Sequence, residues 1–243
     1  MTRSVLITGA SSGIGLQLAR DYRASGWNVV ACGRSTDKLS RLFSEGGYQI
    51  KAFDITDQDS TRKAIGQMRD LDLVILNAGD CEYIDDVRRF DAELFHRVIS
   101  ANLSGTANCL DALLPGLDRG SRLVIVSSSV TYLPLPRAEA YGASKAALDY
   151  LARTLAVDLK SHGIQVSLVR PGFVDTPLTR KNDFPMPGRI SVEKASEYIR
   201  TGIERGKSEI DFPPLFIAVM KLLSWLPGAL WLQLSAKMSR VST

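Results

Sequence analysis

The sequence has few histidines and cysteines, and it begins without a long apolar run. His96 and His162 stand alone in the chain, and Cys32, Cys81 and Cys109 are an odd number without the spacing of metal ligands. We therefore expect no catalytic metal and no disulfide framework, and we expect the cysteines to act as small apolar side chains in or beside the core. Without an apolar signal core, the N-terminus predicts a cytoplasmic protein.

An excess of charge of one sign is also lacking. The 30 Lys and Arg against 26 Asp and Glu give a net charge of +4 and a pI near 9.0, and the basic residues form no block. This balance does not predict nucleic-acid binding, and it leaves small anionic molecules as partners. A chain of 243 residues with 45% hydrophobic composition can bury one sizeable core. We expect a single domain over residues 1–243.

Short, continuous apolar runs alternate with longer stretches of helical spacing. The runs lie at residues 5–7, 28–32, 49–53, 73–76, 123–126 and 166–169, and residues 209–212 are a candidate last strand. Continuous rather than alternating apolar runs are typical of strands that helices cover on both faces. The pattern predicts an α/β fold, a Rossmann-type doubly wound parallel sheet, with ligands at the carboxyl ends of the strands.

A glycine-rich loop, residues 8–15, joins the first apolar run to a segment of helical spacing. Glycines permit a tight turn and a close approach of a pyrophosphate, which backbone N–H groups and a helix N-terminus stabilise. The loop therefore predicts a dinucleotide site, because it stands between a first strand and a first helix. We assign Gly9, Ser11, Ser12, Gly13, Ile14 and Gly15 to cofactor binding.

The end of the second predicted strand bears on which dinucleotide binds. An NAD site usually places an acidic residue there for the adenosine ribose. Here Gly33 takes that place and Arg34 follows, whose guanidinium suits a 2'-phosphate. We therefore expect NADP(H) rather than NAD(H), with Asp37 as an alternative ribose acceptor farther into the loop.

Further motifs follow in a fixed order. They are Asn77-Ala78-Gly79, Asn102-Leu103-Ser104-Gly105, Ser127-Ser128-Ser129, Tyr141-Gly142-Ala143-Ser144-Lys145 and the segment from Arg170 to Pro177. With the glycine loop, their joint occurrence resembles the short-chain dehydrogenase/reductase family from the first strand to about Pro177. This resemblance implies hydride transfer between a nicotinamide and a carbonyl or secondary alcohol.

Tyr141 and Lys145 are four residues apart in a helical segment, so their side chains share one face. A phenol is a poor acid-base group at neutral pH, and an adjacent ammonium lowers its pKa. We therefore expect Tyr141 to exchange a proton with the reacting oxygen and Lys145 also to hold the nicotinamide ribose.

The resemblance implies roles for further residues. Ser128 matches the catalytic serine, with Ser127 and Ser129 as flanking alternatives, and Asn102 would anchor a water that links Lys145 to solvent. The other implied cofactor contacts are Asp54 and Ile55 beside the adenine, Asn77, Ala78 and Gly79 beside the ribose, Pro171 and Gly172 in a turn, and Val174 and Thr176 beside the carboxamide.

The resemblance ends in the last third of the chain. Residues 178–206 occupy the variable substrate region, and residues 213–243 form an apolar C-terminal extension in place of a Gly-rich terminal segment. A helix over residues 215–226 has little polar face, so we expect it to be largely buried. We expect it to pack on the chain's own substrate region, which predicts an apolar carbonyl or alcohol substrate. We also expect a homodimer. For this helix, a dimer contact and a peripheral membrane contact are the alternatives, and proline and lysine leave no transmembrane segment.

Two functions fit these observations. The first is an NADP(H)-dependent oxidoreductase with Asn102, Ser128, Tyr141 and Lys145 as catalytic residues. The second is a non-catalytic NADP(H)-sensing or interaction protein of the same fold. The complete set of four residues favours the enzyme, because binding alone needs no proton donor at the nicotinamide.

Overall fold

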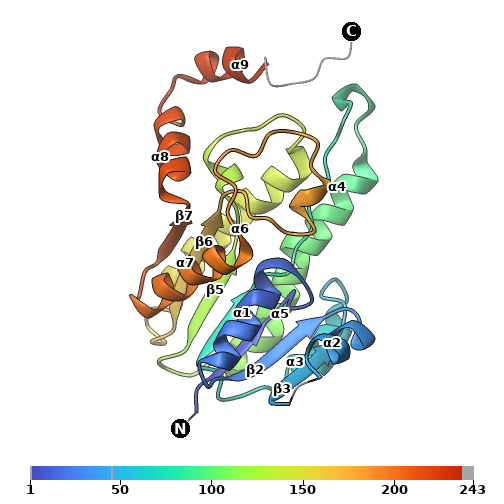
Figure 1. The fold of residues 1–243 in the computed structure, drawn as a ribbon, viewed down its shortest axis with the longest axis vertical. Helices are drawn as coiled ribbons and strands as arrows, with labels where there is room; N and C mark the ends of the chain where they lie inside the picture. Colours follow the sequence, from blue (N-terminus) through green and yellow to red (C-terminus); the bar gives the residue numbers. More distant parts are fainter. Residues whose placement is uncertain (1, 45, 237–243) are drawn as a thin grey trace.

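A parallel sheet forms the centre of the computed structural model, which describes residues 2–44 and 46–236 (Figure 1). Its strands are β1 (Ser4–Ile7), β2 (Asn28–Gly33), β3 (Tyr48–Ala52), β4 (Leu73–Leu76), β5 (Arg122–Val126), β6 (Gln165–Pro171) and β7 (Glu209–Phe212). They run in the order β3-β2-β1-β4-β5-β6-β7, and all pairs are parallel. The predicted doubly wound sheet is confirmed, including the last strand.

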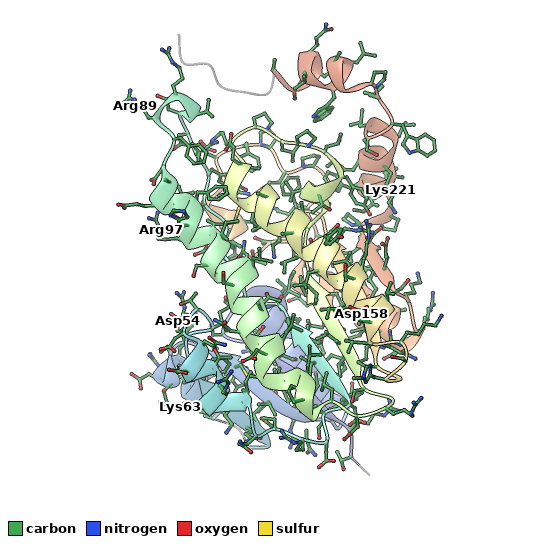
Figure 2. All side chains as sticks on the ribbon, turned by 180° about the vertical axis from the view of Figure 1, so that it is seen from behind. Asp54, Lys63, Arg89, Arg97, Asp158 and Lys221 are labelled. Atoms are coloured by element: carbon green, nitrogen blue, oxygen red, sulfur yellow. The ribbon has the colours of Figure 1, made fainter. Side chains whose placement is uncertain are left out.

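Helices cover both faces of the sheet. The described helices are α1 (Gly13–Ala24), α2 (Thr36–Leu42), α3 (Gln58–Ile65), α4 (Ala92–Ile99), α5 (Gly105–Leu113), α6 (Glu139–Asp158), α7 (Val192–Glu204), α8 (Pro214–Leu223) and α9 (Gly228–Ala236). Buried side chains of α1, α2 and α7 form one core with the sheet, and those of α3, α5 and α6 form the other. Seen from behind, α6 lies beside the α4–α5 segment on the second face (Figure 2). Because helices cover both faces of the sheet, side chains on both sides of each strand are buried, which explains the continuous apolar runs.

Polar residues start several of these helices where the chain leaves the sheet. Ser35, Asp57, Asp91 and Ser191 precede α2, α3, α4 and α7, and each side chain accepts a hydrogen bond from a backbone N–H of the first turn. Such caps satisfy donors that the helix itself leaves unpaired. The helix that follows the glycine loop is different, because Ser12 makes no side-chain capping bond there.

The apolar C-terminal extension contacts the rest of the chain through one side only. Ile217 and Met220 are buried in α8 and Trp231 in α9, whereas Leu222 is 66% and Trp225 84% exposed. The expectation that residues 215–226 are largely buried is therefore wrong for this chain by itself. The reason is geometric: a single face of α8 meets β7 and the turn after β5, and nothing from the described residues covers its other face.

Within the described residues no single helix is long and apolar enough to cross a membrane. The helices α8 and α9 satisfy the criteria of length and composition only as a pair, bent by 117°. Residues 237–243 of the expected extension lie outside the described part of the chain.

Candidate active site

A cleft of about 840 Å³ opens at the carboxyl ends of the strands. It lies where the chain order reverses between β1 and β4, the place at which doubly wound sheets bind ligands. The predicted site residues that line it are Gly9, Ser11, Ser12, Gly13, Ile14, Arg34, Asp54, Ile55, Asn77, Ala78, Gly79, Ser128, Tyr141, Lys145, Pro171, Gly172, Val174 and Thr176. Gly15 and Asn102 do not line the cleft, and the structure places both behind its wall.

The glycine loop leaves no room for side chains at two positions. Gly9 has a φ of +68°, and a Cβ there would stand 2.9 Å from the Ala78 Cα. A Cβ on Gly15 would stand 2.4 Å from the Gly9 carbonyl oxygen, so Gly15 supports the turn from behind. The first N–H groups of a helix lack partners within it, and here they face a cleft. The loop therefore fits a pyrophosphate group.

Thr8 joins this loop to the neighbouring one, a role that the sequence analysis missed. Its hydroxyl accepts hydrogen bonds from the backbone N–H groups of Asn77, at 3.0 Å, and Ala78, at 3.1 Å. The Asn77 side chain donates in return to the Thr8 carbonyl at 3.1 Å. A threonine at the end of the first strand was the available signal. These bonds fix the two loops that form the middle of the cleft.

The end of β2 carries no acidic side chain. Arg34 is exposed at the rim of the cleft, and a Cβ on Gly33 would make only ordinary contacts, the nearest at 3.4 Å. Glycine is therefore not required there by packing, and its effect is to leave the rim without a carboxylate. Across the rim, hydrogen bonds from the backbone N–H and the hydroxyl of Thr56, with a smaller contribution from the charge of Arg34, hold the pKa of Asp54 below its ordinary value.

Tyr141 and Lys145 share one face of α6, as predicted. The Lys145 ammonium lies 5.7 Å from the centroid of the Tyr141 ring and donates a 3.0 Å hydrogen bond to the Val126 carbonyl. Burial lowers the pKa of Lys145 to about 8, against the partial opposition of Cys81 and Asp149. A lysine that titrates this close to neutrality is typical of a functional site.

The expected lowering of the Tyr141 pKa is not what this geometry gives. Burial raises the pKa of Tyr141, Cys81 adds to the rise, and hydrogen bonding with Ser128 opposes it. The hydrogen bonding with Ser128 does not outweigh the burial. The phenol is therefore held in its protonated form, which is the form that donates a proton.

Ser128 is distinguished from its neighbours by position. It begins the short helical turn Ser129–Tyr132, and its Oγ accepts a 3.2 Å hydrogen bond from the Val130 N–H while it lines the cleft with Tyr141. The Ser127 hydroxyl instead donates to the Lys145 carbonyl at 3.1 Å. Ser129 is buried. Of the three serines, Ser128 is therefore the one with a hydroxyl beside Tyr141.

Asn102 lies in a π-helical turn, Ser100–Ser104, between α4 and α5. It is fully buried, its Oδ1 accepts from the Asp80 N–H at 2.6 Å, and its Nδ2 donates to the Asp80 carbonyl and the Ser144 hydroxyl, both at 2.9 Å. A Cβ on Gly79 would stand 2.8 Å from this Oδ1 and 3.5 Å from the Lys145 Nζ. Asn102 thus fixes the strand-end loop to α6 immediately beside Lys145.

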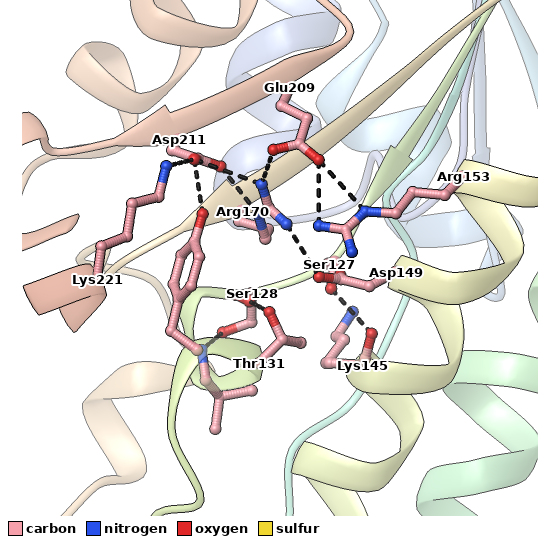
Figure 3. A network of polar contacts seen from close by, with 12 residues as sticks. Ser127, Ser128, Thr131, Lys145, Asp149, Arg153, Arg170, Glu209, Asp211 and Lys221 are labelled. Carbon is pink, nitrogen blue, oxygen red and sulfur yellow. Dashed lines mark hydrogen bonds and ion pairs between the residues drawn. The ribbon is translucent and has the colours of Figure 1, made fainter. Parts of the chain in front are cut away.

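A buried ionic network lies behind Ser128, and the sequence analysis assigned no role to its members (Figure 3). Arg170 is 1% exposed and forms ion pairs with Asp149 at 3.2 Å, with Asp211 at 2.9 Å, and with Glu209. Its guanidinium also lies 4.9 Å from the centroid of the Tyr132 ring. The network therefore joins α6, β6 and β7 to the turn that carries Ser128.

The C-terminal extension reaches this same region. Lys221 of α8 donates to Asp211 at 2.8 Å, and the Trp231 indole of α9 donates to the Pro134 carbonyl at 2.9 Å. A Cβ on Gly172, which lines the cleft, would stand 2.8 Å from the Phe216 ring. The extension thus packs beside the cleft, as we expected, against the segment that leads from Ser128 to Tyr141.

Several known proteins are similar to this chain in sequence. The short chain dehydrogenase family model matches residues 3–185. A protein of Myxococcus xanthus described as an uncharacterized oxidoreductase is 35% identical over 240 residues, which cover 94% of this chain and 94% of that protein. A serine 3-dehydrogenase of Agrobacterium fabrum is 33% identical over 186 residues, which cover 74% and 75% of the two chains.

A solved structure with the same fold is also described as a short chain dehydrogenase. A short chain dehydrogenase from Burkholderia cenocepacia, solved in complex with NADP, superposes with a TM-score of 0.86 at 26% identity. The match covers 96% of this chain and 97% of that one, so it includes the C-terminal part that the family model leaves out.

Proposed function

The chain belongs to the short-chain dehydrogenase family, and we propose that it is an NADP(H)-dependent oxidoreductase that interconverts a carbonyl and a secondary or primary alcohol. The observation that carries this proposal is the convergence of three groups on one cleft: the Ser128 hydroxyl, the Tyr141 phenol and the glycine loop. A cleft that only bound a dinucleotide would not need a protonated phenol beside a second hydroxyl.

The cofactor end of the cleft supports NADP(H). The glycine loop and the N-terminus of α1 suit the pyrophosphate, and Arg34, without a nearby carboxylate at Gly33, suits the 2'-phosphate. The related Burkholderia structure is a complex with NADP. When bound, the nicotinamide supplies or accepts the hydride.

The protein's own part in carbonyl reduction is to bind and protonate the reacting oxygen. The Ser128 hydroxyl donates a hydrogen bond to that oxygen, and Tyr141 transfers its phenolic proton to the same oxygen as negative charge develops. One hydride at carbon and one proton at oxygen convert the carbonyl to the alcohol. The Lys145 ammonium, 5.7 Å from the ring centroid, stabilises the phenolate that remains. Alcohol oxidation reverses each step.

The substrate end supports an apolar substrate. A row of aromatic rings runs from Tyr83 through Phe184 and Phe173 to Phe216, with centroid distances of 5.4, 6.2 and 5.6 Å. Phe216 packs on Gly172 at the wall of the cleft. None of these four rings is among the described residues that line the cleft, but the row adjoins its Gly172 wall, and this apolar area supports the proposal.

Turnover of a carbonyl panel tests the proposal. Purified protein is assayed with NADPH against bulky apolar ketones and aldehydes and against small polar ones, and with NADP against serine, the substrate named for one relative. We expect NADPH consumption with alcohol formation, and higher kcat/KM for the apolar compounds. Tight NADPH binding without turnover of any compound would instead support the sensing protein.

A further inference from the structure

The C-terminal extension carries exposed apolar side chains on α8, on the linker and on α9, and we call this set the apolar face. Its members are Leu215, Val219 and Leu222 of α8, Trp225 of the linker, and Leu230, Leu232 and Leu234 of α9. Their exposed fractions range from 47% to 84%. The surfaces of soluble proteins rarely expose so many large apolar side chains on adjacent segments, and such patches mark contact sites.

The fold holds this face outward. Ile217, Met220 and Trp231 are buried on the inner side of the same helices, the Trp231 indole is bonded to Pro134, and Lys221 is bonded to Asp211. In Figure 1 the two helices lie along one edge of the molecule, with α9 at the end remote from the N-terminus. An isolated interfacial helix needs a polar side that faces water. Here the body of the protein covers that side of the two helices instead.

The charge of this segment is of one sign. All 26 acidic residues of the chain lie within residues 1–211, so none follows Asp211. The remaining 32 residues contain Lys221, Lys237 and Arg240, of which the last two stand outside the described part of the chain. Since Lys221 is paired with Asp211, the positive charge that suits an anionic surface comes from Lys237 and Arg240 in the sequence.

We propose that the apolar face docks the protein on an anionic lipid surface, with the cleft adjacent to it. Each helix is short, since 10 residues span about 15 Å, half of a bilayer core of about 30 Å. The bend of 117° between α8 and α9 suits a segment that lies in the headgroup region. Trp225, at 84% exposure, has the side chain that is enriched at that depth.

A second copy of the chain is a poorer occupant. In a two-fold dimer the same patch faces itself, and a segment whose sequence has basic residues and no acidic ones brings no charge complementarity to that contact. An anionic lipid surface supplies the missing negative charge. The proposal concerns binding and does not depend on the proposed reaction.

Vesicle sedimentation of the full chain tests the proposal. We expect the protein to bind vesicles of phosphatidylcholine and phosphatidylglycerol, and to bind pure phosphatidylcholine and high-salt samples more weakly. Leu222→Glu and Trp225→Glu should each lower the partition coefficient about tenfold or more, because a charge replaces a side chain that enters the interface. Val157→Glu is the matched control, since Val157 on α6 is 73% exposed but lies outside the apolar face.

A fluorescence measurement identifies the contact directly. Brominated lipids should quench the native protein, and Trp225→Phe should remove most of that quenching, because Trp231 is buried. Thermal melts verify that each variant is folded. Absence of vesicle binding by the folded native chain, or equal loss in Val157→Glu, would overturn the proposal. A concentration-dependent dimer in light scattering, dissociated by Leu222→Glu and indifferent to vesicles, would overturn it in favour of a second copy.

Discussion

The phenolic hydroxyl of Tyr132 donates a 2.6 Å hydrogen bond to a carboxylate oxygen of Asp211, a residue 79 positions further along the chain. Tyr132 ends the turn that begins directly after Ser128. Asp211, labelled in Figure 3, lies on β7. Arg170 and Lys221 bond to the same carboxylate. The position of the serine hydroxyl in the cleft therefore depends on the last strand and on α8.

Removing this one hydroxyl should impair turnover more than cofactor binding. Tyr132→Phe keeps the ring between Arg170 and Lys221 and deletes only the bond to Asp211. We expect kcat to fall about threefold to tenfold, as one hydrogen bond of about 0.5–1.5 kcal/mol no longer fixes the turn, while the dissociation constant of NADPH stays the same. Steady-state kinetics and a fluorescence titration measure the two quantities.

The control is Tyr150→Phe, the same change at an exposed tyrosine of α6. It should alter neither quantity. If Tyr132 acts through Ser128, its substitution in a Ser128→Ala background should have little further effect on kcat. Independent, multiplicative losses in the double variant would show that the hydroxyl acts by another route.

Asp211 should make the stability of the protein depend on pH at the acidic end. Burial alone would raise its pKa, but hydrogen bonds from Arg170, Lys221 and Tyr132 hold the pKa below the ordinary value. A carboxyl with a depressed folded pKa stabilises the fold above its unfolded pKa of about 3.9, and this contribution is lost as the pH falls through the folded value.

The free energy of unfolding measures this effect. Asp211→Asn should cost about 3 kcal/mol at pH 7, because it leaves Arg170 buried with one partner fewer. The difference from the native chain should shrink as the pH falls below about 4. Asp118→Asn, at an exposed position, is the control. A difference that stays constant from pH 7 to pH 3 would contradict the assignment.

Arg34 should decide the choice of dinucleotide. A charge-assisted contact to the 2'-phosphate is worth about 1.5 to 3 kcal/mol, so Arg34→Ala should weaken NADPH binding about tenfold to a hundredfold and leave NADH binding almost unchanged. Fluorescence titration gives both dissociation constants. Arg41→Ala is the control, because Arg41 is exposed on α2 and does not line the cleft. Equal weakening of both dinucleotides would refute the role of Arg34.

Lys145 should set the alkaline limit of activity. Burial lowers its pKa to about 8, so its ammonium is present below that pH and is lost above it. Since kcat/KM reports groups of the free enzyme, kcat/KM for carbonyl reduction should decline as the pH rises through about 8. A pH profile that stays flat well into the alkaline range would show that the charge of Lys145 is not needed.

The strands and the glycine loop could be predicted from the sequence because their signals are local. The apolar runs coincide with β1 to β6 within a few residues, and the close contact of Gly9 with Ala78 explains the glycine at position 9. The cleft lining was also predictable, because the carboxyl ends of parallel strands meet at one edge of the sheet.

Contacts between distant residues could not be predicted in this way. Arg170 was visible as the residue before Pro171, but its partners Asp149 and Asp211 stand 21 and 41 positions away and become neighbours only in the folded sheet. The raised pKa of Tyr141 follows from burial and from the neighbouring Cys81, neither of which a spacing of four residues reveals. The exposed fraction of the α8 side chains depends on which other elements pack against the helix, and the composition of α8 does not reveal those elements.

The central claim is that Tyr141 gives its proton to the reacting oxygen, and Tyr141→Phe tests it most directly. This change keeps the ring beside Lys145 and removes only the transferable proton. With a substrate from the carbonyl panel, the rate of NADPH oxidation in a single turnover should fall about 10² to 10⁴-fold while the dissociation constant of NADPH stays the same. A near-normal rate in the folded, NADPH-binding variant would contradict the account.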